Sequence, residues 1–275
     1  MRKRIWSVNH KTKVFYLIID GKKTGFYLSN RLNKTFMAYL QPGVLVDFAV
    51  FDQMKKVNHA WVYQVAYFNQ IIQINPYRIH YDLEQLRAEM KDVLEKKKYF
   101  LFIDFEMTMP GYKERDFQSE IIQVGYVLSE AGKNPILEDG YYVLPKHRTY
   151  LSRRTIKFLK LDADLFFSTA KHYDHFYQAI KDIVETYQPK LVVWGKNDYQ
   201  ALNDSYQLHQ MPKLLQSDDF IDLLKLHKDY YNLKDDLGLF KAYKTYYKIE
   251  EAQAHDAIAD ARVTKMVFDA FLEKM

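Results

Sequence analysis

The segment that most constrains this chain is KKKYFLFIDFEMT, Lys96 to Thr108, in which two acids close an apolar run. Every residue of YFLFI is apolar or aromatic, which is typical of a strand buried on both faces. Side chains two residues apart in a strand share a face, so Asp104 and Glu106 lie side by side. An exposed acidic pair beside a turn is the alternative, but a carboxylate near so buried a strand is unfavourable without a positive partner. A hard divalent cation such as Mg²⁺ is the simplest partner.

Composition sets the outer limits. The 275 residues are 48% hydrophobic and 16% aromatic, enough for one large domain or two modest ones. No apolar run approaches the ~20 residues of a membrane span, and the basic start MRKRIWSVNHKTK has no apolar segment behind it, so we expect a cytoplasmic protein. The absence of cysteine excludes disulfides and thiolate ligands, so any metal must be held by oxygen or imidazole.

The net charge of +5 is unevenly distributed. Residues 1–80 carry 12 Lys and Arg against three Asp, whereas residues 81–275 carry 28 against 32 acids. A basic N-terminal part suits a polyanion and an acidic remainder suits cations, although basic surface can also serve solubility alone.

The first 75 residues consist of β-rich runs separated by turn signals, with almost no helical periodicity. Five short strands with tight connections favour a small closed barrel, because closure removes exposed edges. We therefore expect residues 1–78 to form a small all-β, OB-like or cold-shock-like barrel. The expected strands are KVFYLIID, TGFYLSNRL, TFMAYLQ, VLVDFAVF and AWVYQVAYFNQIIQI.

Aromatic and basic residues are interleaved in this barrel, as in a single-strand groove where rings stack on bases and ammonium groups follow phosphates. Aromatic residues of short strands more often belong to the core, so both interpretations stay open. The residues are Phe15, Tyr16, Phe26, Tyr27, Phe36, Tyr39, Phe48 and Phe51, with Lys11, Lys13, Lys22, Lys23, Arg31 and Lys34.

Residues 79–98 are typical of a linking helix, and from residue 99 the pattern changes to α/β. Three early strands and then alternating helices and strands predict an antiparallel start followed by parallel crossovers. We expect residues 99–275 to form one domain with a mixed five-stranded sheet and flanking helices. The expected strands are Tyr99–Phe105, Glu120–Leu128, Gly140–Leu144, Lys190–Trp194 and Asp219–Leu223, and the helices Lys171–Tyr187, Tyr199–His209, Asp235–Tyr247 and Asp256–Phe271.

Further acids are expected at the same edge of the sheet. In KLVVWGKNDYQAL, Asp198 follows a second buried strand and would face Asp104 if the two strands are parallel, although Asn197 or Asp198 can also cap the next helix. In AQAHDAIADARVTKMVFDAF, His255 and Asp260 are about 140° apart around a helix. His255 therefore belongs at the loop-to-helix junction and Asp260 one turn inside. A histidine alone is usually structural, but beside carboxylates a neutral imidazole can take a proton from water.

Three segments, FIDFEMT, VVWGKNDYQAL and AHDAIADA, resemble in order and spacing the three motifs of the DEDDh (DnaQ-like) 3′–5′ exonuclease superfamily. SEIIQVGYVL and DDFIDLL are also similar to strands of that group, and the resemblance covers residues 99–271. The Trp-Gly pair before Asp198 is closer to the Eri-type and sporulation-inhibitor-like branch than to proofreading subunits. Where many relatives have LTGI, this chain reads FLKLDAD.

The resemblance implies a ribonuclease H-like fold and two-metal hydrolysis at the 3′ end of single-stranded RNA or DNA, releasing nucleoside 5′-monophosphates. It implies that Mg²⁺ or Mn²⁺ ions, two per active site, are bound by Asp104, Glu106, Asp198 and Asp260, and that His255 is the general base. The residues alone favour the same chemistry, because four acids in one pocket require cations.

Two other functions stay open. A haloacid-dehalogenase-like phosphatase has a DxDxT signature that FIDFEMT approaches, but Glu106 stands where an Asp is expected and NLKDDLG is a weak match to its later motif. A catalytically inactive nucleic-acid-binding subunit would keep the fold without the chemistry, although all the motif positions are filled. The sequence indicates neither RNA nor DNA as the preferred substrate.

Overall fold

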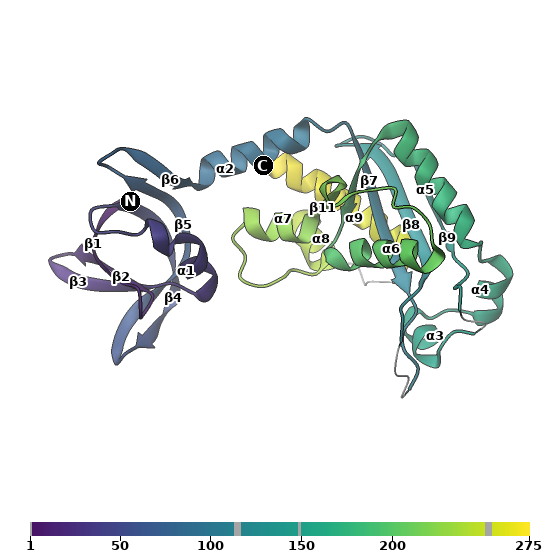
Figure 1. Cartoon of the computed structure of the whole chain (residues 1–275), viewed down its shortest axis with the longest axis horizontal. Coiled ribbons are helices and arrows are strands. Elements are labelled where there is room, and N and C mark those ends of the chain that lie inside the picture. The colour runs from purple at the N-terminus through teal and green to yellow at the C-terminus, as the bar shows by residue number, and fades with distance from the viewer. Residues whose placement is uncertain (1, 113–116, 148–149, 251–254) are drawn as a thin grey trace. The chain divides into compact units, whose positions relative to one another are not determined.

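The computed structural model describes residues 2–112, 117–147, 150–250 and 255–275 (Figure 1). The chain divides into two compact units, Met1–Lys91 and Asp92–Met275. Each unit has its own sheet and its own hydrophobic core. None of the helices in the described ranges has the length and apolar character that crossing a membrane requires.

The first unit has a barrel-like sheet. Strand β1 pairs with both β2 and β4, β2 pairs with β3, and β4 pairs with β5. A parallel pairing of β3 with β5 joins the two ends of this series, and β6 adds to β5 outside the ring. The strands are β1 (Lys3–Asn9), β2 (Val14–Ile19), β3 (Lys22–Tyr27), β4 (Leu45–Val57), β5 (Ala60–Gln73) and β6 (Arg78–Asp82).

The prediction of a strand at TFMAYLQ is wrong. Helix α1 (Asn30–Phe36) and a short 3-10 turn (Met37–Tyr39) occupy that part of the chain. The side chain of Ser29 caps α1 by accepting a hydrogen bond from the Leu32 N–H at 3.4 Å, and Leu32 packs into the barrel core. Strand β1 is not indicated by the sequence, because Ile5 is its one buried residue.

The second unit confirms the expected mixed five-stranded sheet. Its strand order is β11-β10-β7-β8-β9, with β7, β8 and β9 antiparallel and β10 and β11 parallel to β7. The strands are β7 (Tyr99–Met107), β8 (Ile121–Glu130), β9 (Leu137–Tyr142), β10 (Lys190–Val193) and β11 (Phe220–Asp222).

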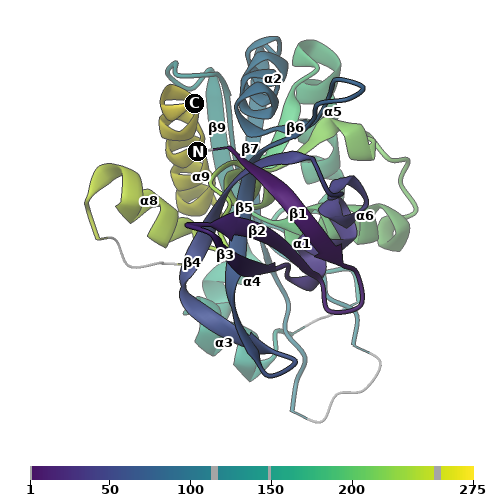
Figure 2. The same ribbon diagram turned by 90° about the vertical axis from the view of Figure 1, so that its left-hand side faces the viewer.

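Helices cover both faces of this sheet, and Figure 2 shows α9 and α5 on opposite sides of the strands. Helix α2 (Leu83–Glu95) precedes β7. The others are α3 (Arg153–Leu159), α4 (Ala163–Thr169), α5 (Tyr173–Tyr187), α6 (Lys196–His209), α7 (Leu223–Tyr230), α8 (Leu239–Tyr247) and α9 (Ala257–Lys274). The sequence does not indicate α3, α4 or α7, because seven or eight residues are too few to establish a helical period.

The two faces of β7 pack against different helices, as strand alternation requires. Phe100 and Phe102 contact Phe268 of α9, with ring centroids 4.8 and 5.3 Å away. Phe105 lies on the opposite face of β7 and packs edge to face on Phe176 of α5, with ring centroids 5.8 Å apart. Asp104 continues the series of Phe100 and Phe102, and therefore belongs to the face that α9 covers.

Candidate active site

Three carboxylates meet where β7 ends and α9 begins. Asp104, Glu106 and Asp260 each offer one oxygen, and these oxygens lie within 4.8 Å of one another. Asp104 and Glu106 retain some solvent access, whereas Asp260 is only 3% exposed. Oxygens at this separation suit a shared hard cation, which binds carboxylates at roughly 2.0–2.6 Å.

Two glycines let α9 approach the sheet closely enough to form this cluster. Gly125 of β8 pairs with Asp104, and a Cβ on Gly125 would lie 2.1 Å from the backbone nitrogen of Ile258. A Cβ on Gly140, the partner of Gly125 in β9, would lie 2.7 Å from Cβ of Ile258. Neither glycine is among the functional residues expected from the sequence. The signal was an isolated glycine inside the apolar strand SEIIQVGYVL, which is typical of a close backbone approach.

Asp256 is a third residue near the site that the sequence does not predict. It is the N-cap of α9, because its Oδ1 accepts a hydrogen bond from the Ala259 N–H at 3.0 Å. Its Oδ2 accepts a hydrogen bond from Nε2 of Gln123 in β8, also at 3.0 Å. The helix start is therefore tied to the sheet, one turn before Asp260.

Asp198 lies in the first turn of α6 and approaches β7 from the other side. Its Oδ1 accepts a hydrogen bond from the backbone N–H of Phe105 at 3.1 Å. The pairing of β10 with β7 ends at Phe102, so Asp198 takes an N–H group beyond the end of that ladder. The capping alternative is not supported, because Gly195 is the N-cap of α6. Asp198 is buried but stands outside the group of three carboxylates.

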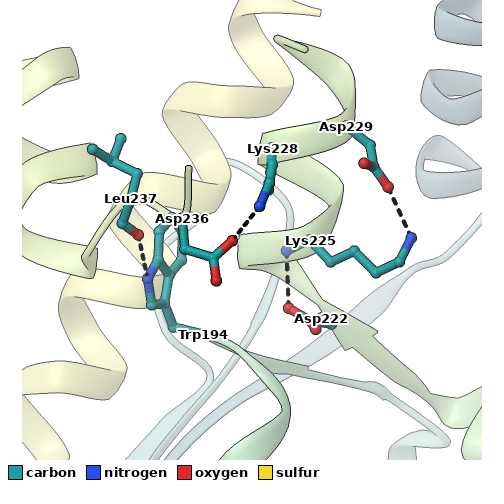
Figure 3. Close-up of polar contacts among 7 residues, drawn as sticks. All are labelled: Trp194, Asp222, Lys225, Lys228, Asp229, Asp236 and Leu237. Carbon is teal, nitrogen blue, oxygen red and sulfur yellow. Dashed lines mark hydrogen bonds and ion pairs between the residues drawn. The ribbon is translucent and has the colours of Figure 1, made fainter. Parts of the chain in front are cut away.

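The Trp-Gly pair before Asp198 shapes the turn from β10 into α6. Gly195 has a φ of +97°, which glycine adopts without strain. The indole nitrogen of Trp194 donates a hydrogen bond to the carbonyl of Leu237 at 3.1 Å, which fixes the loop before α8 (Figure 3). The same view shows the ion pairs Lys228–Asp236 at 2.6 Å and Lys225–Asp229 at 2.8 Å, and the Lys225 N–H donating to Asp222, the N-cap of α7.

His255 stands two residues before α9, at the junction that its spacing from Asp260 predicts. Its Nδ1 lies 3.8 Å from Oε1 of Glu106, and its side chain is 31% exposed. Its ring packs against Phe158 of α3, with ring centroids 4.4 Å apart. The imidazole is thus held beside the carboxylates while solvent still reaches it.

The carboxylates raise one another's pKa values. Burial, followed by the charges of Asp198, Asp260 and Glu106, raises the pKa of Asp104 well above its usual range. Burial and the neighbouring acids raise the pKa of Glu106 to about 7. Burial also raises the pKa of Asp198 to about 7, although the Phe105 N–H opposes the shift. A cation bound between these carboxylates would favour their ionised forms and so lower their pKa values again.

Comparisons with known proteins agree with this geometry. The profile of the family RNase_T, described as Exonuclease, matches residues 101–268, which is more than half of the chain. This match contradicts the haloacid-dehalogenase-like alternative. No curated protein matches the chain.

Several solved structures share the fold. The nuclease domain of 3′hExo, a DEDDh family member bound to rAMP, is 19% identical, with a TM-score of 0.56 over 65% of this chain and 93% of that one. Cell-death related nuclease 4 (CRN-4) is 18% identical, with a TM-score of 0.54 over 65% of this chain and 64% of that one. The zinc-bound E. coli ExoI–ssDNA complex is 17% identical, with a TM-score of 0.51 over 65% of this chain and 41% of that one.

The ribonuclease H-like mixed α/β fold expected for the second unit is therefore confirmed. The chain belongs to the RNase T exonuclease family, within the DEDDh (DnaQ-like) 3′–5′ exonuclease superfamily.

Proposed function

We propose that the chain is a metal-dependent 3′–5′ exonuclease that removes nucleoside 5′-monophosphates from the 3′ end of single-stranded RNA or DNA. The observation that carries the proposal is the group of Asp104, Glu106 and Asp260, whose oxygens lie within 4.8 Å of one another, with His255 3.8 Å from Glu106. Family membership supports hydrolysis of nucleic acid. The bound rAMP of the 3′hExo nuclease domain and the single-stranded DNA of the ExoI complex support the substrate class.

Asp198 and the three clustered carboxylates are our candidate ligands for two Mg²⁺ or Mn²⁺ ions. The donor set fits, because all donors are oxygens and their mutual repulsion calls for positive charge. Asp104 would be shared by both ions, Glu106 and Asp260 would hold one, and Asp198 the other. When bound, such ions stabilise charge on the attacking and leaving oxygens. The hydrogen bond from the Phe105 N–H holds Asp198 in place for this role.

His255 is our candidate general base, so His255→Ala is expected to lower kcat by about 10²- to 10⁴-fold without abolishing cleavage. A neutral imidazole accepts the proton of the attacking water, so the variant should lose the part of the pH dependence of cleavage that this proton transfer causes. The measurement is the pH profile of mononucleotide release. His172→Ala is the matched control, since His172 makes no side-chain cap at the start of α5. A wild-type pH profile in His255→Ala protein would remove the assignment.

The function itself is tested with 5′-labelled single-stranded RNA and DNA, each with a free or a blocked 3′ end, in Mg²⁺, Mn²⁺ or EDTA. We expect shortening by single nucleotides from free 3′ ends with either metal, and none in EDTA or with blocked ends. Oligonucleotides that bind but stay intact under every condition would favour the inactive-subunit alternative. Internal fragments from 3′-blocked substrates would contradict exonuclease activity and indicate that the protein is an endonuclease.

We further propose that the first unit is an OB-like barrel and that the chain has three parts, residues 1–78, 79–98 and 99–275. The series β3-β2-β1-β4-β5, joined at its ends by the parallel β3–β5 pairing, supports a closed five-stranded barrel. Helix α1 lies in the chain between β3 and β4. Helix α2 includes the boundary between the two compact units.

A further inference from the structure

Strand register brings two tyrosines to one outer face of the barrel-like sheet. In the β2–β3 ladder, Tyr16 pairs with Gly25 and Val14 pairs with Tyr27. Directly opposite residues share a face, and so do residues two apart along a strand. The alternate residues of these strands point into the core, namely Phe15, Leu17 and Phe26. Tyr16 and Tyr27 therefore lie together on the outside.

Lysines reach the same face from two strands. Lys23 of β3 places its Nζ 4.4 Å from the ring centroid of Tyr16. Lys55 of β4 places its Nζ 4.2 Å from the ring centroid of Tyr27. Lys55 pairs with Val62 of β5. The side chain of Val62 lies over Gly25, because a Cβ added to Gly25 would be 2.7 Å from Cγ1 of Val62. Four strands thus contribute to this surface, which we call the tyrosine face: Tyr16, Lys23, Gly25, Tyr27, Lys55 and Val62.

Gly25 keeps the centre of the tyrosine face flat. A Cβ at this position would lie 3.1 Å from Cε1 of Tyr16, so the Tyr16 ring extends across the glycine. Both tyrosines are half-buried, and both lysines are exposed. A flat base can therefore stack on the rings if the lysine side chains swing aside, and the released ammonium groups remain within reach of its phosphates.

Charge complementarity identifies the class of partner. Residues 1–80 carry 12 Lys and Arg against three Asp, so the unit that bears the tyrosine face attracts polyanions. Rings beside ammonium groups are the combination with which proteins hold single strands, because every base has a π-face and every nucleotide a phosphate. A duplex hides its base faces, and an acidic protein has none.

We propose that the tyrosine face binds single-stranded nucleic acid, with bases stacked on Tyr16 and Tyr27 and phosphates bound by Lys23 and Lys55. This site is distinct from the carboxylate cluster and does not depend on cleavage. It would give the chain a second hold on a strand, separate from the 3′ end.

The test measures fluorescence anisotropy of labelled single-stranded RNA and DNA with the full-length protein in EDTA, so that hydrolysis does not interfere. Tyr16→Leu and Tyr27→Leu are each expected to raise Kd about fivefold or more, whereas Tyr16→Phe and Tyr27→Phe keep the affinity. Tyr77→Leu is the matched control, because Tyr77 is a 71% exposed tyrosine between β5 and β6. A duplex of the same sequence should bind more weakly than the single strand.

The lysines give a second readout that does not disturb the core. Lys23→Gln and Lys55→Gln should each weaken binding and reduce the slope of log Kd against log salt by about 0.7. Lys56→Gln is the charge-matched control, because Lys56 is an exposed lysine of β4 whose place next to Lys55 directs it to the opposite face of the strand. Leucine variants that bind like the wild type, or controls that weaken binding equally, would overturn the proposal. Because binding and cleavage are measured separately, an inactive protein with an intact tyrosine face would contradict only the proposed exonuclease function.

Discussion

Replacing Asp104 by Asn is expected to abolish cleavage, with kcat lowered by at least ~10³-fold. Asp104 is the acid whose pKa the other three motif carboxylates raise, and it lies on the strand face that α9 covers. An amide has nearly the same shape but supplies no negative oxygen for a cation. The measurement is single-turnover release of the labelled 3′-terminal nucleotide at saturating Mg²⁺.

The same substitution should stabilise the protein in EDTA, which separates a lost function from a lost fold. The folded-state pKa of Asp104 is raised, so the folded protein is penalised once the pH exceeds the pKa of the unfolded chain. That penalty is absent well below the pKa of about 3.9 that Asp has in an unfolded chain, and above it the penalty grows with rising pH by at most ~1.4 kcal/mol per unit. Asn carries no charge, so we expect the variant to have a larger free energy of unfolding than the wild type at pH 8 in urea unfolding, and the difference should shrink as the pH is lowered.

Asp222→Asn is the matched control for both readouts. Asp222 ends β11, beside β10 in the same sheet, but its Oδ1 caps α7 by accepting the Lys225 N–H at 2.9 Å. We expect activity and stability close to those of the wild type, because Asn and Asp are about equally good N-caps and the side-chain oxygen that accepts the bond is kept. Wild-type cleavage by Asp104→Asn protein would contradict the active-site assignment.

Replacing Gly125 by Ala is expected to remove most of the activity without touching any acid. The new Cβ would lie 2.1 Å from the nitrogen of Ile258 and 2.2 Å from the carbonyl carbon of Ala257. These are backbone atoms that cannot rotate aside, so the first turn of α9 must move, and Asp260 moves with it. A misplacement of about 1 Å costs roughly 10²-fold in rate, and overpacking costs about 1–3 kcal/mol in the free energy of unfolding.

Gly238→Ala provides the comparison for this experiment. A Cβ at Gly238 would meet nothing within 4 Å, and its backbone is extended at a φ of −64°. We expect unchanged cleavage and a stability change below about 1 kcal/mol. If Gly125→Ala protein were as active and stable as the wild type, the close approach of α9 to β8 would not be what positions Asp260.

The sequence of neighbouring residues determined several features of the second unit. The apolar run before Asp104 made β7 a central strand, and period-two alternation put Asp104 on the same side as Phe102. The five-residue spacing from His255 to Asp260 fixed where α9 begins. Long apolar runs and their flanking turns carry this information in adjacent residues, so a single sequence is enough to read it.

Tertiary structure alone decided which distant atoms meet. Asp198 looked equally suited to capping a helix, and only the early end of the β10–β7 ladder gave it the Phe105 N–H. The passage of α9 over Gly125 and the anchoring of Asp256 by Gln123 depend on residues 130 or so apart, which no local pattern links. Helix α1 formed where a strand was expected because the barrel core could bury Leu32 and Phe36 four residues apart. Sequence periodicity specifies a side chain's face, whereas its partner on that face is set by how the elements pack together.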